Sequence, residues 1–258
     1  MNAKTEELLY FLLWSAEALT QPTFRNLNAS YESWAYRRGF VRQIARLEKR
    51  RLVEGRVDSG ARIYRLTESG CLRALGGRDP TAQWSRPWDG RWRLVLFDLP
   101  ITQNSARARL RRNLRDKGFG CMQKSVWITP DKLDQEVELL GGRKVDVKGL
   151  TLFEAIPCSG ESNADIVSGA WDFDRINHFY EKHQVILSKR PTGKNAKAHL
   201  TVLRRWAATE RTAWLQAVTA DPLLPQELLP AKYLGRQAWQ QRIRVLGKVR
   251  QDLDKVAF

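Results

Sequence analysis

Apolar and basic residues recur with a helical period between Arg37 and Lys49. Phe40, Ile44 and Leu47 share one helical face, so the pattern predicts an amphipathic helix that buries them. The basic residues fall on another face, at positions 38, 42, 46 and 49. A cationic row opposite an apolar row is typical of a helix that lies in the major groove of DNA.

A strand–turn–strand pattern follows this helix directly. It predicts strands at 52–57 and 61–66, joined by Asp58-Ser59-Gly60, where Gly60 can adopt a positive φ. Thr67 is predicted to cap a short helix, and an apolar seam at 4–19 predicts a first helix. Residues 1–76 therefore predict a winged helix-turn-helix. A solvated helix face would explain the basic row by itself, but the adjoining wing favours DNA binding.

The middle of the chain alternates between strand and helix patterns. Strands are predicted at 91–99, at 122–129 (one strand or two short ones) and at 150–156, with helices at 103–117 and 131–140. This β-α-β-β-α-β order is that of a ferredoxin-like fold. In the first of these helices, Leu110 and Leu114 are predicted to face inward. Arg107, Arg111 and Arg115 are predicted to face outward, either toward DNA phosphates or as a solvated surface.

The remainder is predicted to be mainly helical. Helices are expected at 173–187, 196–219 and 233–256, and the last has an apolar seam formed by Trp239, Ile243, Leu246 and Leu253. Three prolines within 221–230 predict a rigid connection. The fold class is therefore α+β. Its predicted parts are a winged helix-turn-helix domain (1–76), a linker (77–87), a ferredoxin-like dimerisation domain (88–157) and a helical C-terminal domain (158–258).

Charge and composition narrow the function. Lysine and arginine exceed the acidic residues by 16 along the whole chain, which favours a polyanionic partner such as nucleic acid. The longest apolar run, 8–14, is too short to span a bilayer, so no membrane association is expected. The isolated Cys71, Cys121 and Cys158 indicate a reducing cytoplasm. Neither they nor the histidines have the spacing of metal ligands, so no metal and no cofactor are expected.

Three stretches of the chain resemble the PaaX-like transcriptional repressors of phenylacetate degradation. D-P-L-L-P-Q-E-L-L-P at 221–230 is nearly identical to a stretch of that family. W-D-G-R-W-R at 88–93 leads to G-F-G at 118–120, and F-V-R-Q-I-A-R-L at 40–47 is followed by L-T-E-S-G at 66–70. The resemblance implies a homodimer that binds double-stranded operator DNA and releases it on binding an aryl-CoA thioester such as phenylacetyl-CoA. It does not identify the effector-binding residues.

The middle segment also resembles the small CRISPR spacer-integration subunit. The matching stretches are V-L-F-D at 95–98 and G-F-G-C-M-Q-K-S-V-W-I at 118–128. In that protein a strand-end aspartate is linked to metal-dependent nuclease chemistry, and the sheet mediates dimerisation. Asp98 occupies the matching position, which makes a metal-dependent nuclease the alternative function. The simpler interpretation is that Asp98 caps the turn before Pro100 or the following helix.

The sequence thus predicts a dimeric, sequence-specific DNA-binding repressor and not an enzyme. Its predicted DNA contacts form three groups. Base edges are assigned to Arg42, Gln43 and Arg46, phosphates to Arg37, Arg38, Lys49 and Arg50, and the wing contacts to Arg56 and Arg62.

Overall fold

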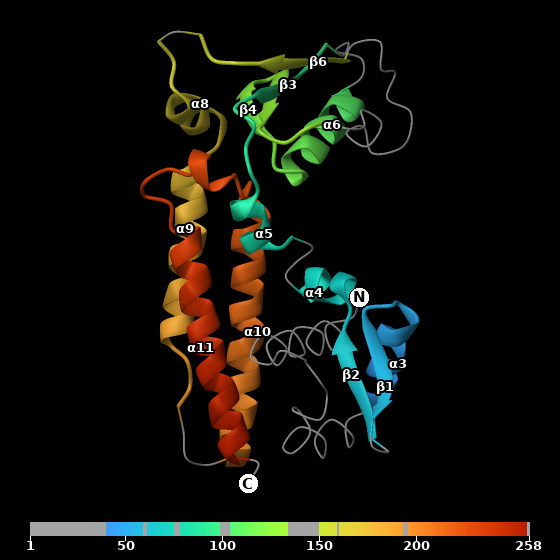
Figure 1. The fold of residues 1–258 in the computed structure, drawn as a ribbon. Coiled ribbons are helices and arrows are strands. Elements are labelled where there is room, and N and C mark those ends of the chain that lie inside the picture. The colour runs from blue at the N-terminus through green and yellow to red at the C-terminus, as the bar shows by residue number, and fades with distance from the viewer. Residues whose placement is uncertain are drawn as a thin grey trace. The chain divides into compact units, whose positions relative to one another are not determined.

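The structure is a computed structural model that describes residues 40–58, 61–74, 78–98, 104–133, 150–158, 160–192 and 196–256. These residues form a mixed α+β structure with two antiparallel sheets and several helices (Figure 1). The chain divides into two compact units. One comprises Met1–Asp79, Tyr180–Leu215 and Gly235–Phe258, and the other comprises Pro80–Phe179 and Gln216–Leu234.

The N-terminal part of the first unit contains a helix, a hairpin and a second helix. Helix α3 (Phe40–Lys49) precedes strands β1 (Val53–Asp58) and β2 (Ala61–Leu66), and helix α4 (Glu68–Ala74) follows them. The two strands pair antiparallel along their whole length. Both strand predictions are confirmed to within one residue. The helix predicted at 4–19 and the turn residues 59–60 lie outside the described residues.

The second unit contains a four-stranded antiparallel sheet. Its strands are β3 (Trp92–Phe97), β4 (Gly120–Gln123), β5 (Val126–Thr129) and β6 (Leu150–Ala155), in the spatial order β4-β5-β3-β6. The segment predicted as one strand or two is therefore two strands, separated by a turn at 124–125. Of the helix predicted at 131–140, residues 131–133 are not helical and the rest lie outside the described residues.

Helix α6 (Asn104–Asp116) covers one face of this sheet (Figure 1). Leu110 and Leu114 are buried against apolar residues of β3 and β5, as predicted. The helix ends where Gly118 adopts a φ of 88°, which a residue with a side chain rarely adopts. Gly118 N donates to Arg115 O (2.9 Å) and Phe119 N donates to Leu114 O (3.0 Å). These two bonds complete a Schellman ending and turn the chain toward β4.

The other face of the sheet packs against helix α8 (Asn163–Ala170), which the sequence analysis did not predict. The helix begins with a capping box, in which Asp165 N donates to Ser162 Oγ and Ser162 N donates to a carboxylate oxygen of Asp165. A Cβ atom on Gly120 would lie 2.7 Å from Ala170 Cβ and from the Trp171 ring. Glycine at 120 therefore allows the close packing of this strand and helix.

The predicted linker, 77–87, contains the short helix α5 (Pro80–Ser85). Trp84 is buried, and its Nε1 donates to the hydroxyl of Tyr233 across 3.0 Å. That hydroxyl donates in turn to Oδ2 of Asp221, while Oδ1 of Asp221 accepts from Leu223 N at 2.8 Å. A chain of hydrogen bonds therefore ties α5 to the proline-rich segment 221–230.

The proline-rich segment 221–230 connects α10 to α11 without a continuous helix, as its three prolines predict. It contains only a single turn of 3₁₀ helix, η4 (Gln226–Leu228), and Leu223 adopts a left-handed φ of 52°. Leu223, Leu224 and Leu228 are buried. The Leu223 carbonyl also accepts a hydrogen bond from Arg86, whose guanidinium forms a bidentate ion pair with Asp131.

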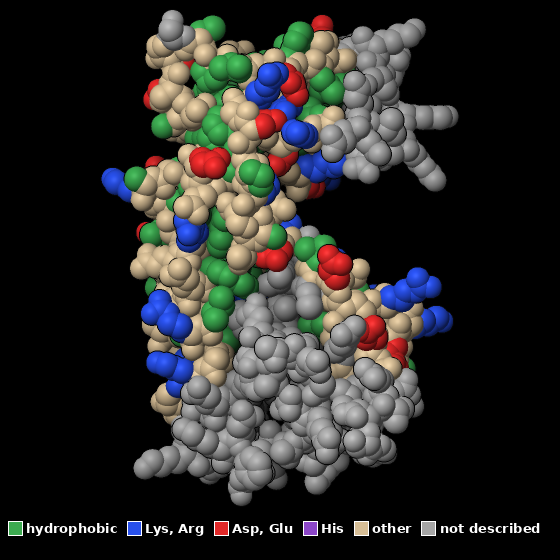
Figure 2. Space-filling model, in the orientation of Figure 1, with side chains coloured by type: hydrophobic (Ala, Val, Ile, Leu, Met, Phe, Trp, Pro, Cys, Tyr) green, Lys and Arg blue, Asp and Glu red, His purple; other side chains and the backbone are tan. Residues whose placement is uncertain are grey.

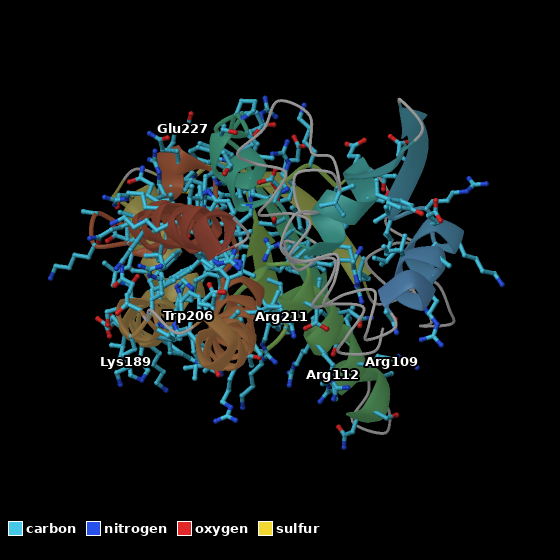
Figure 3. All side chains as sticks on the ribbon, turned by 90° about the horizontal axis from the view of Figure 1, so that it is seen from below. Arg109, Arg112, Lys189, Trp206, Arg211 and Glu227 are labelled. Atoms are coloured by element: carbon cyan, nitrogen blue, oxygen red, sulfur yellow. The ribbon has the colours of Figure 1, made fainter. Side chains whose placement is uncertain are left out.

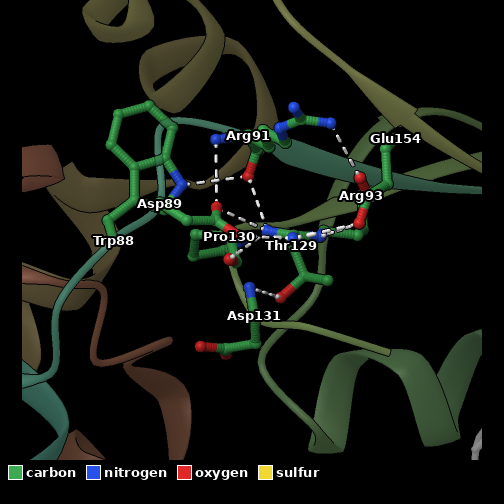
Figure 4. Close-up of polar contacts among 8 residues, drawn as sticks. All are labelled: Trp88, Asp89, Arg91, Arg93, Thr129, Pro130, Asp131 and Glu154. Atoms are coloured by element: carbon green, nitrogen blue, oxygen red, sulfur yellow. Dashed lines mark hydrogen bonds and ion pairs between the residues drawn. The ribbon is translucent and has the colours of Figure 1, made fainter. Parts of the chain in front are cut away.

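The W-D-G-R-W-R stretch forms a polar clasp at one end of the sheet (Figure 4). Arg93 is almost fully buried, and its NH2 lies 2.5 Å from Asp89 Oδ2 and 3.1 Å from Glu154 Oε1. Its NH1 also donates to the carbonyl of Pro130. The hydrogen bonds from Arg93 hold the pKa of Asp89 well below its usual range. The clasp therefore joins β3, β6 and the loop after β5.

Three long helices provide the C-terminal core. These are α9 (Phe173–Ser188), α10 (Ala196–Ala220) and α11 (Gly235–Val256), and all three helix predictions are confirmed to within two residues. In the first unit, their residues lie side by side and share a core of Leu187, Leu203, Trp206, Leu246 and Val249. The tryptophans at 84, 92, 127, 171, 206, 214 and 239 are buried and fill the core.

The apolar seam predicted for the last helix is partly wrong. Trp239 and Leu246 are buried, but Ile243 is 38% exposed and Arg242 is fully buried in its place. Arg242 Nε lies 2.6 Å from Oε1 of Glu210, and its guanidinium stacks on Trp214. Because this carboxylate neutralises the guanidinium, an arginine can occupy a core position that a hydrophobicity pattern assigns to its neighbour.

Candidate nucleic-acid interface

Helix α3 has one buried side and one basic side. Leu47 is fully buried and Ile44 is 8% exposed, whereas Arg46 and Lys49 are exposed. Arg50, which follows the helix, is also exposed. Where the structure describes side chains, the predicted division of this helix is therefore confirmed. Figure 2 shows Lys and Arg side chains projecting outward at the position of α3.

The end of α3 is fixed by backbone geometry. Arg51 adopts a left-handed φ of 57°, with Arg51 N donating to Glu48 O (2.8 Å) and Leu52 N to Leu47 O (2.9 Å). This is again a Schellman ending, although glycine is the residue that most often occupies the left-handed position. It sends the chain straight from the basic helix into β1.

Thr67 connects the end of α3 to the start of α4. Its hydroxyl donates to Arg51 O (2.7 Å) and accepts from Gly70 N (3.0 Å), which confirms Thr67 as the cap of α4. A Cβ atom on Gly70 would lie only 1.9 Å from the carbonyl oxygen of Leu52. Glycine is required here because α4 crosses directly against the backbone that links α3 to the hairpin.

The two predicted wing arginines occupy opposite faces of the hairpin. The register pairs Arg56 with Ile63 and Arg62 with Val57. Directly paired positions share a face and successive positions alternate, so Arg62 falls on the face of the Val53–Leu66 pair and Arg56 on the other. Both Val53 and Leu66 are buried. By register the two positions therefore lie on opposite faces of the hairpin, and the side chains of Arg56 and Arg62 are outside the described part of the structure.

Several other predicted contacts are described only in part. Arg37 and Arg38 lie outside the described residues, and for Arg42 only the helical backbone is described. Gln43 is partly buried in α3. The structure therefore brings Arg46, Lys49 and Arg50 to one exposed region, and the assignment of the remaining positions stays a prediction.

Asp98, the residue of the nuclease alternative, is exposed directly after β3. Its predicted role as a cap involves residues 99–103, which lie outside the described residues. Among the side chains that the structure describes, no three or more His, Cys, Asp or Glu residues are grouped as metal ligands would be. Likewise, none of the described helices is both long and apolar enough to cross a bilayer.

The outward face of α6 differs in part from the prediction, which is confirmed for Arg115 and wrong for Arg107 and Arg111. Arg109, Arg112 and Arg115 are exposed, whereas Arg107 and Arg111 are partly buried. Arg111 bends toward the sheet, because its Nε donates to the carbonyl of Lys124 at 3.0 Å.

The helical core also contains a buried polar cluster that the sequence patterns did not predict. Glu210 Oε1 lies 2.6 Å from Arg242 Nε and 2.8 Å from His183 Nε2, and all three side chains are fully buried. Burial raises the pKa of Glu210 and lowers that of Arg242, because a low-dielectric environment disfavours both charges. The only signal in the sequence was a helical spacing that placed Arg242 three residues after Trp239.

Comparison with known proteins identifies two domains. Residues 85–167 match the PaaX protein central Cas2-like domain, and residues 171–256 match the PaaX-like protein C-terminal domain. The chain therefore belongs to the PaaX-like family, and the resemblance inferred from the sequence is confirmed. The Cas2-like character of the matched central domain also agrees with the likeness to the small CRISPR subunit.

Two individual proteins are also similar to this chain. Over 198 residues the chain is 29% identical to the transcriptional repressor PaaX of Escherichia coli (strain K12), with 74% of this chain and 59% of the repressor covered. The chain thus spans about three-fifths of that relative's length. The uncharacterized protein Rv0674 from Mycobacterium tuberculosis, of known structure, is 22% identical, covers 82% of each chain and has a TM-score of 0.49.

Proposed function

We propose that this chain is a dimeric, sequence-specific transcriptional repressor that binds operator DNA through α3 and the β1–β2 hairpin. The observation that carries the proposal is the two-sided α3. Ile44 and Leu47 anchor the helix inward, Arg46 and Lys49 face solvent, and an antiparallel hairpin follows immediately. Family membership and the similarity to a transcriptional repressor support a regulator over an enzyme.

In this proposal the basic residues have different roles. Arg42, Gln43 and Arg46 read base edges, because arginine and glutamine can make paired hydrogen bonds to guanine and adenine. Arg37, Arg38, Lys49 and Arg50 hold phosphates. On the hairpin, we assign the backbone or minor-groove contact to Arg56 before Arg62, because Arg62 shares its face with a buried pair.

Dimerisation and release complete the proposal. Two copies bind half-sites about one helical turn apart, or a multiple of that distance. An aryl-CoA thioester such as phenylacetyl-CoA releases the operator, as the family resemblance implies. Thermal denaturation with a panel of aryl-CoA thioesters tests this step, since a ligand that binds only the folded chain must raise the melting temperature.

The DNA-binding test begins with an operator selected from random duplexes and mapped by footprinting. Arg46→Ala is expected to lower the preference for this operator over unrelated DNA by about 1–3 kcal/mol. Lys49→Ala is expected to weaken binding to both DNAs alike and to reduce the slope of log K against log salt by about one.

Arg244→Ala is the matched control, because Arg244 is an exposed arginine in the middle of α11. It should leave both the operator preference and the salt slope unchanged. An unaltered preference in Arg46→Ala, with operator binding intact, would remove α3 from the proposed interface. Failure of the parent protein to select any sequence would overturn sequence-specific binding itself.

A further inference from the structure

The second unit carries a dense basic surface that the proposed operator contacts do not use. Between Asn104 and Asp116, helix α6 contains five arginines and one aspartate. Arg109, Arg112 and Arg115 are exposed at intervals of three residues, and Figure 3 shows Arg109 and Arg112 projecting from the helix. We propose that this face of α6 is a second, sequence-independent contact for the phosphate backbone of duplex DNA.

Fold stability does not explain this arrangement. Residues three and four positions apart are neighbours on a helix surface, and like charges at these spacings destabilise it. Arg112 has such a neighbour on each side, in Arg109 and Arg115. Among the described residues, these three arginines form no ion pair with a carboxylate. A polyanion would replace this mutual repulsion with attraction.

The neighbouring turn extends the basic surface. The Arg111 Nε–Lys124 O hydrogen bond brings the β4–β5 turn against α6, and the Lys124 side chain there is exposed. The Arg115 guanidinium lies over the Trp127 ring, with its Cζ 5.9 Å from the ring centre. The exposed basic side chains therefore extend from two elements, α6 and the β4–β5 turn, that contact each other beside a buried core.

The chemistry of the surface favours DNA phosphates. Arginine presents a planar fork of N–H donors that matches phosphate oxygens. Arg109 to Arg115 spans about 9 Å of helix axis at 1.5 Å per residue, and duplex DNA carries about one charge per 1.7 Å. The apolar residues Leu110 and Leu114 are buried in the core, so α6 has no free apolar face to insert into a lipid surface.

The test compares two double variants of the full chain on a duplex that lacks the operator. Arg109→Gln with Arg112→Gln is expected to reduce the slope of log K against log salt by about two, at about 0.9 per lost phosphate contact. Between 50 and 200 mM salt, the loss of affinity should become about tenfold smaller. Arg236→Gln with Arg244→Gln removes the same charge from exposed positions on α11 and should leave the slope unchanged.

The inference rests on the proposed function in taking DNA as the partner, but the two fail differently. If the parent protein binds no DNA, the proposed function fails. If it binds and the α6 variant keeps the parent slope, α6 is a solvated face and this inference is wrong. Equal losses in both double variants would show that net charge matters and the α6 surface does not. If the α6 variant keeps the parent slope on DNA but loses binding to vesicles of phosphatidylserine and phosphatidylcholine, α6 binds a lipid surface instead.

Discussion

Replacing Arg242 by methionine should strongly destabilise the helical core. Arg242 and Glu210 are both fully buried and their side chains are 2.6 Å apart. Methionine keeps much of the packing against Trp214 but leaves the Glu210 carboxylate without its cation. Breaking a buried ion pair on one side costs about 3–5 kcal/mol, a large part of the 5–15 kcal/mol that typically stabilises a protein.

The measurement is urea denaturation followed by tryptophan fluorescence, to which Trp214 and Trp239, both packed against Arg242, contribute. Arg244→Met, two positions along the same helix and exposed, is the control and should change stability by less than about 0.5 kcal/mol. Glu210→Leu combined with Arg242→Met should be more stable than Arg242→Met alone, because no charge then remains unpaired.

The pH dependence follows from the raised pKa of Glu210. The folded protein retains the Glu210 proton to a higher pH than the unfolded chain, whose carboxyl titrates near 4.5. The folded state then binds more protons, so this group lowers stability as pH rises above 4.5. Without Arg242, ionising the buried Glu210 carboxyl costs more free energy. The loss of stability caused by Arg242→Met should therefore be larger at pH 8 than at pH 5. A deficit below about 1 kcal/mol, or one that grows toward pH 5, would refute this reasoning.

Three further substitutions test the close contacts described above. Gly70→Ala should destabilise the α3–hairpin–α4 segment by about 1–3 kcal/mol, because its Cβ would meet the Leu52 carbonyl oxygen at 1.9 Å. Hydrogen exchange of the β1 and β2 amides measures this loss, and unchanged protection would contradict it. Thr67→Ala should cost about 1 kcal/mol in the same assay through the lost helix cap, whereas Thr67→Ser should retain most of the stability. Asp221→Ala should cost about 1–3 kcal/mol in thermal denaturation by removing the acceptor of Leu223 N and of the Tyr233 hydroxyl, and an unchanged melting temperature would show that these bonds contribute little.

Sequence patterns predicted those elements in which the residues that favour the element locally also have the burial that the pattern assigns to them. The spacing of Leu110 and Leu114 predicted α6, because the same residues that favour a helix also face the sheet. Thr67 was predicted as a cap because a hydroxyl before a helix has a specific donor to satisfy, and Gly70 N is that donor. The end of the predicted helix 103–117 is also set locally, because Gly118 adopts a left-handed φ.

Two short helices were missed although each had a local signal. In α5, Pro80 stands at the first helical position, where its missing N–H costs nothing. In α8, Ser162 and Asp165 form a capping box, a pattern that is visible in the sequence. Both helices are too short to show a clear apolar period. What holds them is tertiary contact, through Trp84 in one case and Trp171 in the other.

The buried cluster of Glu210, His183 and Arg242 could not be predicted from periodicity. A hydrophobicity pattern places charged residues outside, so it chose Ile243 over Arg242 for the seam. Only the meeting of three helices brings the compensating groups together, at separations of 27 and 32 residues. The candidate interface shows the same limit. The basic row on α3 could be predicted from the sequence, but the assignment of positions 56 and 62 to opposite faces depends on the hairpin register.

The bond between Trp84 and Tyr233 has a consequence for how the protein is made. The two residues are 149 positions apart, so a ribosome that adds 5–20 residues per second completes Trp84 about 7–30 s before Tyr233. Throughout that interval the indole has no native acceptor. Synthesis that stops before Asp221 would leave α5 without its tether, even though every residue of the four-stranded sheet had already been translated.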